Sequence, residues 1–132
     1  MTIQIRQMAA STSEVAIRGH RVMIDRPTDK GGEDLGPMGG ELFLAAVGGC
    51  FMSTLLAAVK ARQAQVSDVQ TEVIATMEGS PSRFSEIELC VTANCTDRGL
   101  FEKLVEIAER GCIMVNTLRG KLDLKVRIGE RV

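Results

Sequence analysis

Aromatic side chains are scarce in this sequence, and a basic surface is missing. The chain has no tryptophan, no tyrosine and only 4 phenylalanines among 132 residues. Proteins that bind single-stranded nucleic acids stack the bases on aromatic side chains, and this chain has few with which to do so. The net charge is −1 at pH 7 and lysine and arginine form no run, which also argues against such a partner. We therefore expect no nucleic acid to bind.

The N-terminus also lacks the apolar segment of a secretory signal. Four cysteines in a chain without an export signal are more often reduced, catalytic or redox-active than a structural disulfide framework. Hydrophobic residues make up 45% and charged residues 25% of the chain, as in ordinary globular proteins. We expect a cytoplasmic protein that folds as a single domain over residues 1–132.

The alternation of apolar and polar residues predicts the order βββ–α–ββ–α–β. An antiparallel meander of three short strands is followed by a helix, a hairpin, a second helix and a last strand. These elements are predicted in residues 2–25, 41–60, 66–94, 97–118 and 121–128. Asp97 is expected to cap the second helix and Gly111 to interrupt it. Strands grouped in hairpins with two helices indicate an α+β fold rather than a doubly wound one.

The most apolar segment, residues 42–59, carries no charge. It is long enough to span a membrane, but alanine, glycine, serine and threonine dilute it, and it has no interfacial tryptophan or tyrosine. A helix that is apolar on every side must otherwise be buried on every side. A domain of this size has few elements to surround it, so a second copy is the simplest cover. We expect no membrane span, and a homodimer with these helices at its centre.

One cysteine, Cys50, stands inside this segment, directly after Gly48 and Gly49. A free cysteine often packs in a core as a small hydrophobe, and that reading stays open. The glycines weaken a helix by about 1 kcal/mol each, which indicates a close backbone approach or a break. If the helix breaks there, Cys50 begins a new helix whose N–H groups would stabilise its thiolate. Since Gly111 and Cys112 repeat the pattern, the two cysteines are candidates for a peroxidatic and a resolving thiol.

Three motifs resemble those of the OsmC/Ohr family, the osmotically inducible protein C and organic hydroperoxide resistance proteins. They are GHRVMID in residues 19–25, GPMGGELFLAAVGGC in residues 36–50 and AERGCIMVNTL in residues 108–118. The resemblance covers nearly the whole chain. It implies the OsmC-like α+β fold, an intertwined homodimer with two central helices flanked by antiparallel sheets, and active sites at the subunit interface.

The resemblance also implies an activity, that of a thiol-dependent peroxidase. Such an antioxidant enzyme of the stress response reduces organic hydroperoxides to alcohols. By position, Cys50 matches the peroxidatic cysteine and Cys112 the resolving one. A sulfenic acid on Cys50 would condense with Cys112 to a disulfide, which a dithiol of the lipoyl type would reduce. No cofactor is implied.

The sequence departs from the peroxidase pattern at the residues that would activate the thiolate. Gly40 stands where peroxidase members have a glutamate, although Glu41 matches a glutamate common in the wider family. The turn between the first two strands has no arginine, which leaves Arg18 and Arg21 as substitutes. A proline is common where this chain has Ile113. These features resemble a less characterised branch, and they favour an alternative, a non-peroxidase protein that binds a small apolar ligand at the dimer interface.

The remaining candidates have ordinary structural interpretations. Arg18 and Arg21 lie at a turn, where solvated charges are normal. His20, the only histidine, is interpreted as a turn residue. Cys90 is expected to point outward from its strand, and its pairing with Cys95 lacks the further ligands that zinc requires. We expect no metal site.

Overall fold

The computed structural model describes residues 1–130, which form two compact units. The first unit spans Met1–Phe43 and the second begins at Leu44. The order of the strands and of the two long helices is the predicted order βββ–α–ββ–α–β. A single domain over residues 1–132 stays a prediction.

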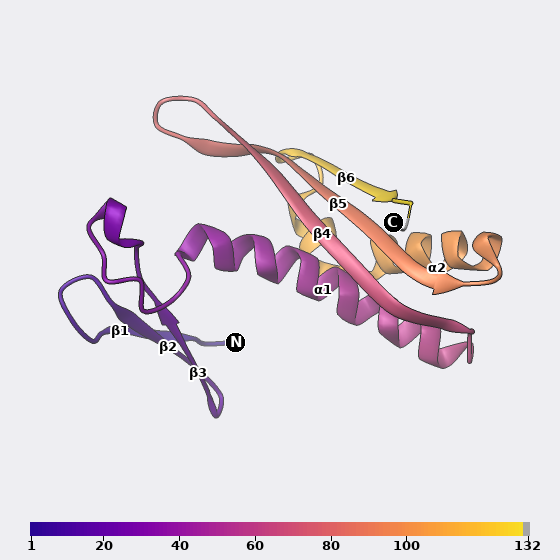
Figure 1. The fold of residues 1–132 in the computed structure, drawn as a ribbon, viewed down its shortest axis with the longest axis horizontal. Helices are drawn as coiled ribbons and strands as arrows, with labels where there is room; N and C mark the ends of the chain where they lie inside the picture. The colour runs from indigo at the N-terminus through magenta and orange to yellow at the C-terminus, as the bar shows by residue number, and fades with distance from the viewer. Residues whose placement is uncertain (131–132) are drawn as a thin grey trace. The chain divides into compact units, whose positions relative to one another are not determined.

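The first unit is the predicted antiparallel meander, with strand order β1–β2–β3. Its strands are β1 (Gln4–Gln7), β2 (Ser13–Ile17) and β3 (His20–Ile24) (Figure 1). Tight turns and alternating apolar residues leave few other pairings for such short strands. Pairing of Gln4 with Ala16, and of Ala16 with Arg21, places these three side chains on one face.

A buried carboxylate, that of Asp25, organises the glycine-rich loop after β3. The groups that donate hydrogen bonds to it are the Thr12 hydroxyl (3.0 Å) and the backbone N–H groups of Arg26 (2.7 Å), Glu33 (3.3 Å) and Leu35 (3.2 Å). Burial acts to raise the pKa of Asp25, but hydrogen bonds from Ser11, Arg26, Leu35 and Thr12 outweigh it and lower the pKa to about 2. The carboxylate is therefore ionised at neutral pH and ties the loop to the sheet.

The loop itself is compact. It contains a short 3-10 helix, η1 (Thr28–Lys30), and passes very close to its own start. A Cβ on Gly32 would overlap the carbonyl oxygen of Arg26, and one on Gly36 would overlap that of Met23. The sequence did not predict the carboxylate that orders this loop.

The second unit consists of a three-stranded sheet and helices (Figure 1). Its elements are α1 (Gly39–Ala61, which starts in the first unit), β4 (Val66–Glu78), β5 (Arg83–Cys95), α2 (Arg98–Gly111), α3 (Ile113–Leu118) and β6 (Asp123–Ile128). β4 and β5 form the predicted hairpin, and β6 pairs with β5 in parallel. The Asp97 carboxylate accepts the Leu100 N–H at 2.9 Å, so the predicted cap is present.

One face of this sheet forms the core of the second unit. Ile87, Leu89 and Val91 of β5 alternate along this face and are fully buried. The helices supply the other large buried side chains, among them Phe51, Leu55, Phe101 and Leu104. These aliphatic and phenylalanine side chains fill the core without tryptophan or tyrosine.

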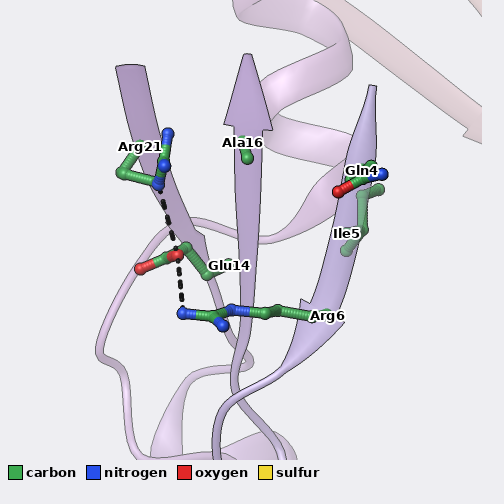
Figure 2. A pocket seen from close by; sticks show the side chains of 6 residues that line it. All are labelled: Gln4, Ile5, Arg6, Glu14, Ala16 and Arg21. Carbon is green, nitrogen blue, oxygen red and sulfur yellow. Dashed lines mark hydrogen bonds and ion pairs between the residues drawn. The ribbon is translucent and has the colours of Figure 1, made fainter. Parts of the chain in front are cut away.

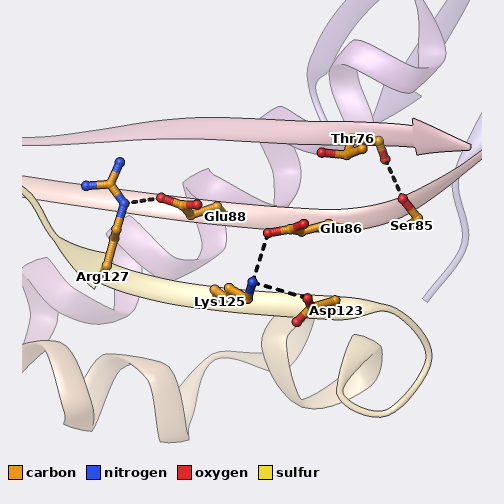
Figure 3. A network of polar contacts seen from close by, with 7 residues as sticks. All are labelled: Thr76, Ser85, Glu86, Glu88, Asp123, Lys125 and Arg127. Atoms are coloured by element: carbon orange, nitrogen blue, oxygen red, sulfur yellow. Dashed lines mark hydrogen bonds and ion pairs between the residues drawn. The ribbon is translucent and has the colours of Figure 1, made fainter.

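The opposite face of the sheet carries ion pairs (Figure 3). The Lys125 ammonium lies 3.2 Å from Glu86 and 3.3 Å from Asp123, and the Arg127 guanidinium pairs with Glu88. Cys90 lies on this face, as its alternation with Leu89 and Val91 predicts, but it is buried there. Only 9% of it is accessible, because Gly129 passes so close that a Cβ there would lie 2.6 Å from the sulfur.

Helix α1 is continuous through its two central glycines. The alternative in which a break lets Cys50 begin a new helix is therefore wrong. The glycines instead have different surroundings: a Cβ on Gly48 would lie 2.6 Å from Cγ2 of Val73, whereas one on Gly49 would contact nothing within 4 Å. Gly48 thus permits close packing of the helix on β4.

By length and composition alone, α1 could cross a membrane, with a mean hydropathy of 2.1 over its most apolar window. The core helix of a folded domain meets the same criterion, so this finding alone is weak evidence for a span. One third of the window is buried within the chain. Within the second unit, the exposed residues of α1 are Ala45, Ala46, Gly49, Ser53, Leu56, Ala57, Lys60 and Ala61.

Candidate thiol active site

The structure brings Cys50 and Cys112 together. Cys50 lies near the middle of α1, and Cys112 lies between the last residue of α2 and the first of α3. Their sulfurs are 3.4 Å apart, and the Cys112 thiol donates a hydrogen bond to the Cys50 sulfur. Both cysteines are free thiols, so the pair is in its reduced form. The sequence predicted these two partners although 62 residues separate them.

Small contacts bring the end of α2 onto α1 next to the thiols. The Thr54 hydroxyl donates to the Cys50 carbonyl at 3.0 Å, which fixes the direction of its methyl group. A Cβ on Gly111 would lie 3.2 Å from that methyl group. Glycine therefore allows the last residue of α2 to approach α1 closely, and Cys112 follows directly.

Two further contacts hold α3 in place after the turn. The Asn116 side-chain amide donates to the Arg110 carbonyl at 2.9 Å, and the Arg119 guanidinium lies 3.7 Å from the Glu109 carboxylate. Both contacts join α3 to the end of α2. They fix the short turn that carries Cys112.

The environment moves the pKa values of the two thiols in opposite directions. The backbone N–H of Met114 is the main cause that lowers the pKa of Cys50, and it outweighs the burial that would raise it. The Cys112 thiol and the Ile113 N–H lower the pKa of Cys50 further. Burial is the main cause that raises the pKa of Cys112, and the nearby Cys50 sulfur adds to it. The arrangement therefore favours a thiolate on Cys50 and a protonated donor on Cys112.

The other predicted site residues belong to the first unit, where each has its own surroundings. The Arg21 guanidinium lies 3.5 Å from the Glu14 carboxylate, which Arg6 also approaches at 3.5 Å (Figure 2). These side chains line a surface hollow of about 420 Å³. Arg18 is exposed at the β2–β3 turn, with a φ of 52°.

Glu41 lies in the first turn of α1, and its carboxylate accepts the Met38 N–H at 2.9 Å. This contact satisfies a backbone donor at the start of the helix. Catalytic roles for Arg18, Arg21 and Glu41 stay predictions. His20 is exposed as the first residue of β3, and within residues 1–130 no group of three histidine, cysteine or acidic residues could hold a metal ion.

The donors that act on Cys50 were missed by reasoning from the sequence. The N–H groups of Ile113 and Met114 belong to the backbone, so no residue type marks them. The only signal was the Gly111–Cys112 pair, which predicted an interruption of the helix at this point.

Residues 31–127 match the family model described as OsmC-like protein. An OsmC-like protein from Mycoplasma pneumoniae superposes with a TM-score of 0.84 at 16% identity, covering 97% of this chain and 94% of that one. Organic hydroperoxide resistance protein OsmC from Legionella pneumophila gives 0.76 at 19%, covering 98% and 96%. Organic hydroperoxide resistance protein OhrB of Bacillus subtilis gives 0.70 at 20%, covering 97% and 96%.

These likenesses define the class of the protein: it has the mixed α+β fold of OsmC-like proteins, with two sheets and helices. Among curated proteins, no sequence matches this chain. The family model covers well over half of the chain, and the chain therefore belongs to the OsmC-like protein family.

Proposed function

We propose that this protein is a thiol-dependent peroxidase that reduces organic hydroperoxides to alcohols. The observation that carries the proposal is the sulfur pair, in which a thiol with a raised pKa donates a hydrogen bond to one with a lowered pKa at 3.4 Å. Peroxide reduction needs two thiols with different roles. One sulfur attacks the peroxide as a thiolate, and the other is a nearby thiol that condenses with the resulting sulfenic acid. Structural relatives described as organic hydroperoxide resistance proteins support the same activity.

The proposed reaction has two chemical steps and a recycling step. The Cys50 thiolate attacks the outer oxygen of the hydroperoxide, the O–O bond breaks, and the alkoxide leaves and takes a proton from water. Cys50 becomes a sulfenic acid, which condenses with the Cys112 thiol to give a disulfide and one water. A dithiol then reduces the disulfide by exchange and is itself oxidised to a disulfide. The lipoyl type of reductant remains a prediction from the family resemblance, and the cytoplasmic location remains a prediction from the sequence.

Thiol counting after one equivalent of cumene hydroperoxide tests this function. The wild-type protein is expected to lose two titratable thiols, because the sulfenic acid on Cys50 goes on to consume Cys112. The Cys112→Ser variant is expected to lose one, because its sulfenic acid has no partner at 3.4 Å. A Cys50 that remains open to alkylation after excess peroxide would refute the peroxidase.

That refuting result would favour the alternative function, an OsmC-fold protein that binds a small apolar ligand. Gly40 is the residue that favours this alternative, since it supplies no carboxylate where peroxidase members carry one. A measurement of the pKa of Cys50 would also distinguish the peroxidase from the ligand-binding protein. A value near that of a free thiol, about 8.5, would speak for the ligand-binding protein.

We also propose that the protein is a homodimer that covers the exposed side of α1. This side is apolar or small over several turns, and Leu56 on it is 47% exposed. Small residues on one side of a helix allow a second helix to approach closely, and burial of Leu56 would be favourable.

Light scattering tests the dimer. The wild-type protein is expected at twice the mass of the chain, and Leu56→Lys at the mass of a monomer, because a buried lysine without a partner is costly. Ile74→Lys is the matched control, since Ile74 is 41% exposed and lies on the ion-pair face of the sheet. A wild-type monomer, or equal effects of both variants, would contradict the proposed interface.

A further inference from the structure

The two sulfurs of the candidate site are spaced for a ligand that binds thiols in pairs. The sulfurs of Cys50 and Cys112 lie 3.4 Å apart, and both are free thiols. With metal–thiolate bonds of about 2.3 Å, two thiolates lie roughly 4.6 Å apart on a linear metal ion and roughly 3.8 Å apart on a tetrahedral one. Trivalent arsenic forms bonds of similar length but is pyramidal, with an S–As–S angle only slightly wider than a right angle. It therefore holds two sulfurs closer together than either metal geometry does, as this pair requires.

The rest of the chain supplies no further ligand to this pair. Zinc in proteins takes four ligands, and within residues 1–130 no group of three histidine, cysteine or acidic residues could hold a metal ion. Cys90 lies on the face of the sheet opposite Val73, against which α1 packs. Cys95 follows Cys90 by five residues, roughly 17 Å along the strand. A ligand that matches the site therefore needs two exchangeable positions and no more.

We propose that Cys50 and Cys112 form a binding site for monosubstituted trivalent arsenicals, in which arsenic carries one carbon group and two exchangeable positions. In the reaction with an arsine oxide, two As–S bonds form and the bond between arsenic and oxygen breaks. The two thiol protons leave with the oxygen as one water. Arsenic stays trivalent, so no oxidant or reductant takes part. This inference does not depend on the proposed peroxidase, although the complex would block that activity by occupying both thiols.

The protein holds the pair in place and leaves it accessible from one side. Cys112 is fully buried, whereas Cys50 is partly exposed, so the ligand enters at Cys50. The Asn116 amide donates to the Arg110 carbonyl at 2.9 Å and so holds the turn that carries Cys112. A preorganised site loses little freedom on binding, which raises affinity. Once one sulfur is bound, the effective concentration of the other strengthens binding by about 100- to 10,000-fold.

Mass spectrometry after treatment with phenylarsine oxide tests the site in the unaltered protein. The reduced protein is expected to gain one phenylarsenic group per chain and to lose two hydrogens. After denaturation, iodoacetamide should label Cys90 and Cys95 and spare Cys50 and Cys112. Dithiothreitol, a dithiol, should release the group, whereas glutathione, a monothiol, should not. Labelling of Cys50 or Cys112, or release by glutathione, would overturn the inference.

Single substitutions measure what the second As–S bond contributes. Cys50→Ser and Cys112→Ser should each raise the apparent Kd for phenylarsine oxide at least about 100-fold. Cys95→Ser is the matched control and should keep the wild-type value. Dimethylarsinous acid has one exchangeable position, so glutathione should remove it from the wild-type protein. Wild-type affinity in either Cys50→Ser or Cys112→Ser would overturn the pair as the site.

Neither experiment uses peroxide, so the two proposals can fail separately. A protein that binds phenylarsine oxide through both thiols but does not consume cumene hydroperoxide would refute the peroxidase and leave the arsenical site standing. A protein that consumes the hydroperoxide but releases phenylarsine oxide to glutathione would refute the arsenical site alone.

Discussion

Replacing Cys50 with serine is expected to slow consumption of cumene hydroperoxide at least about 1,000-fold. The attacking group must be an anion at neutral pH. A free thiol has a pKa of about 8.5, and the surroundings of Cys50 lower its pKa from the ordinary value. A serine hydroxyl in the same place stays protonated, because two N–H groups and a thiol donor cannot offset its far weaker acidity. The assay is hydroperoxide loss with a dithiol present in excess.

The other cysteines provide the controls for this result. Cys95→Ser removes a partly exposed thiol at the end of β5 and is expected to keep the wild-type rate. Cys112→Ser should consume about one equivalent of hydroperoxide in a single rapid turnover and then stop or slow, because its sulfenic acid cannot close a disulfide. Activity that survives Cys50→Ser but disappears in Cys95→Ser would assign the reaction to a different thiol.

The positions of the two thiols could be predicted because each follows a glycine in a recognisable context. Gly111 interrupts a helical pattern, and residues 42–59 form an uncharged run in which Cys50 stands out. The direction of each pKa shift could not be predicted, since it depends on which sulfur meets the backbone of the turn and which is more deeply buried. The helix break considered at Cys50 was wrong, because α1 runs without interruption from Gly39 to Ala61.

The strands could be predicted from the local residue pattern, but contacts between residues far apart in the sequence could not. Alternation in β4 and β5 reports which residues face the core, and it gave the hairpin correctly. Cys90 shows the limit: its place on the polar face follows from alternation, but its burial depends on Gly129, which lies 39 residues further along the chain. Asp25 is a second example, because its hydrogen bonds come from the backbone of the loop that follows β3 and not from neighbours in the strand pattern.

The largest effect on stability is expected from Gly48→Ala. A Cβ at this position would lie 2.6 Å from Cγ2 of Val73, and Val73 is β-branched and therefore stiff. Overpacking of this kind costs about 1–3 kcal/mol, whereas the better helix propensity of alanine returns about 1 kcal/mol. The overlap should win, and the free energy of unfolding in urea should fall by up to about 2 kcal/mol.

A double-mutant cycle shows whether the overlap is the cause. Val73→Ala alone removes partly buried methyl groups and should destabilise the protein. Combined with Gly48→Ala it also removes the atom that the new Cβ would strike, so the double variant should be more stable than the sum of the single effects predicts. Strict additivity would mean that α1 and β4 do not approach as closely at this point as the 2.6 Å implies. Gly48 would then serve a purpose other than packing α1 on the sheet.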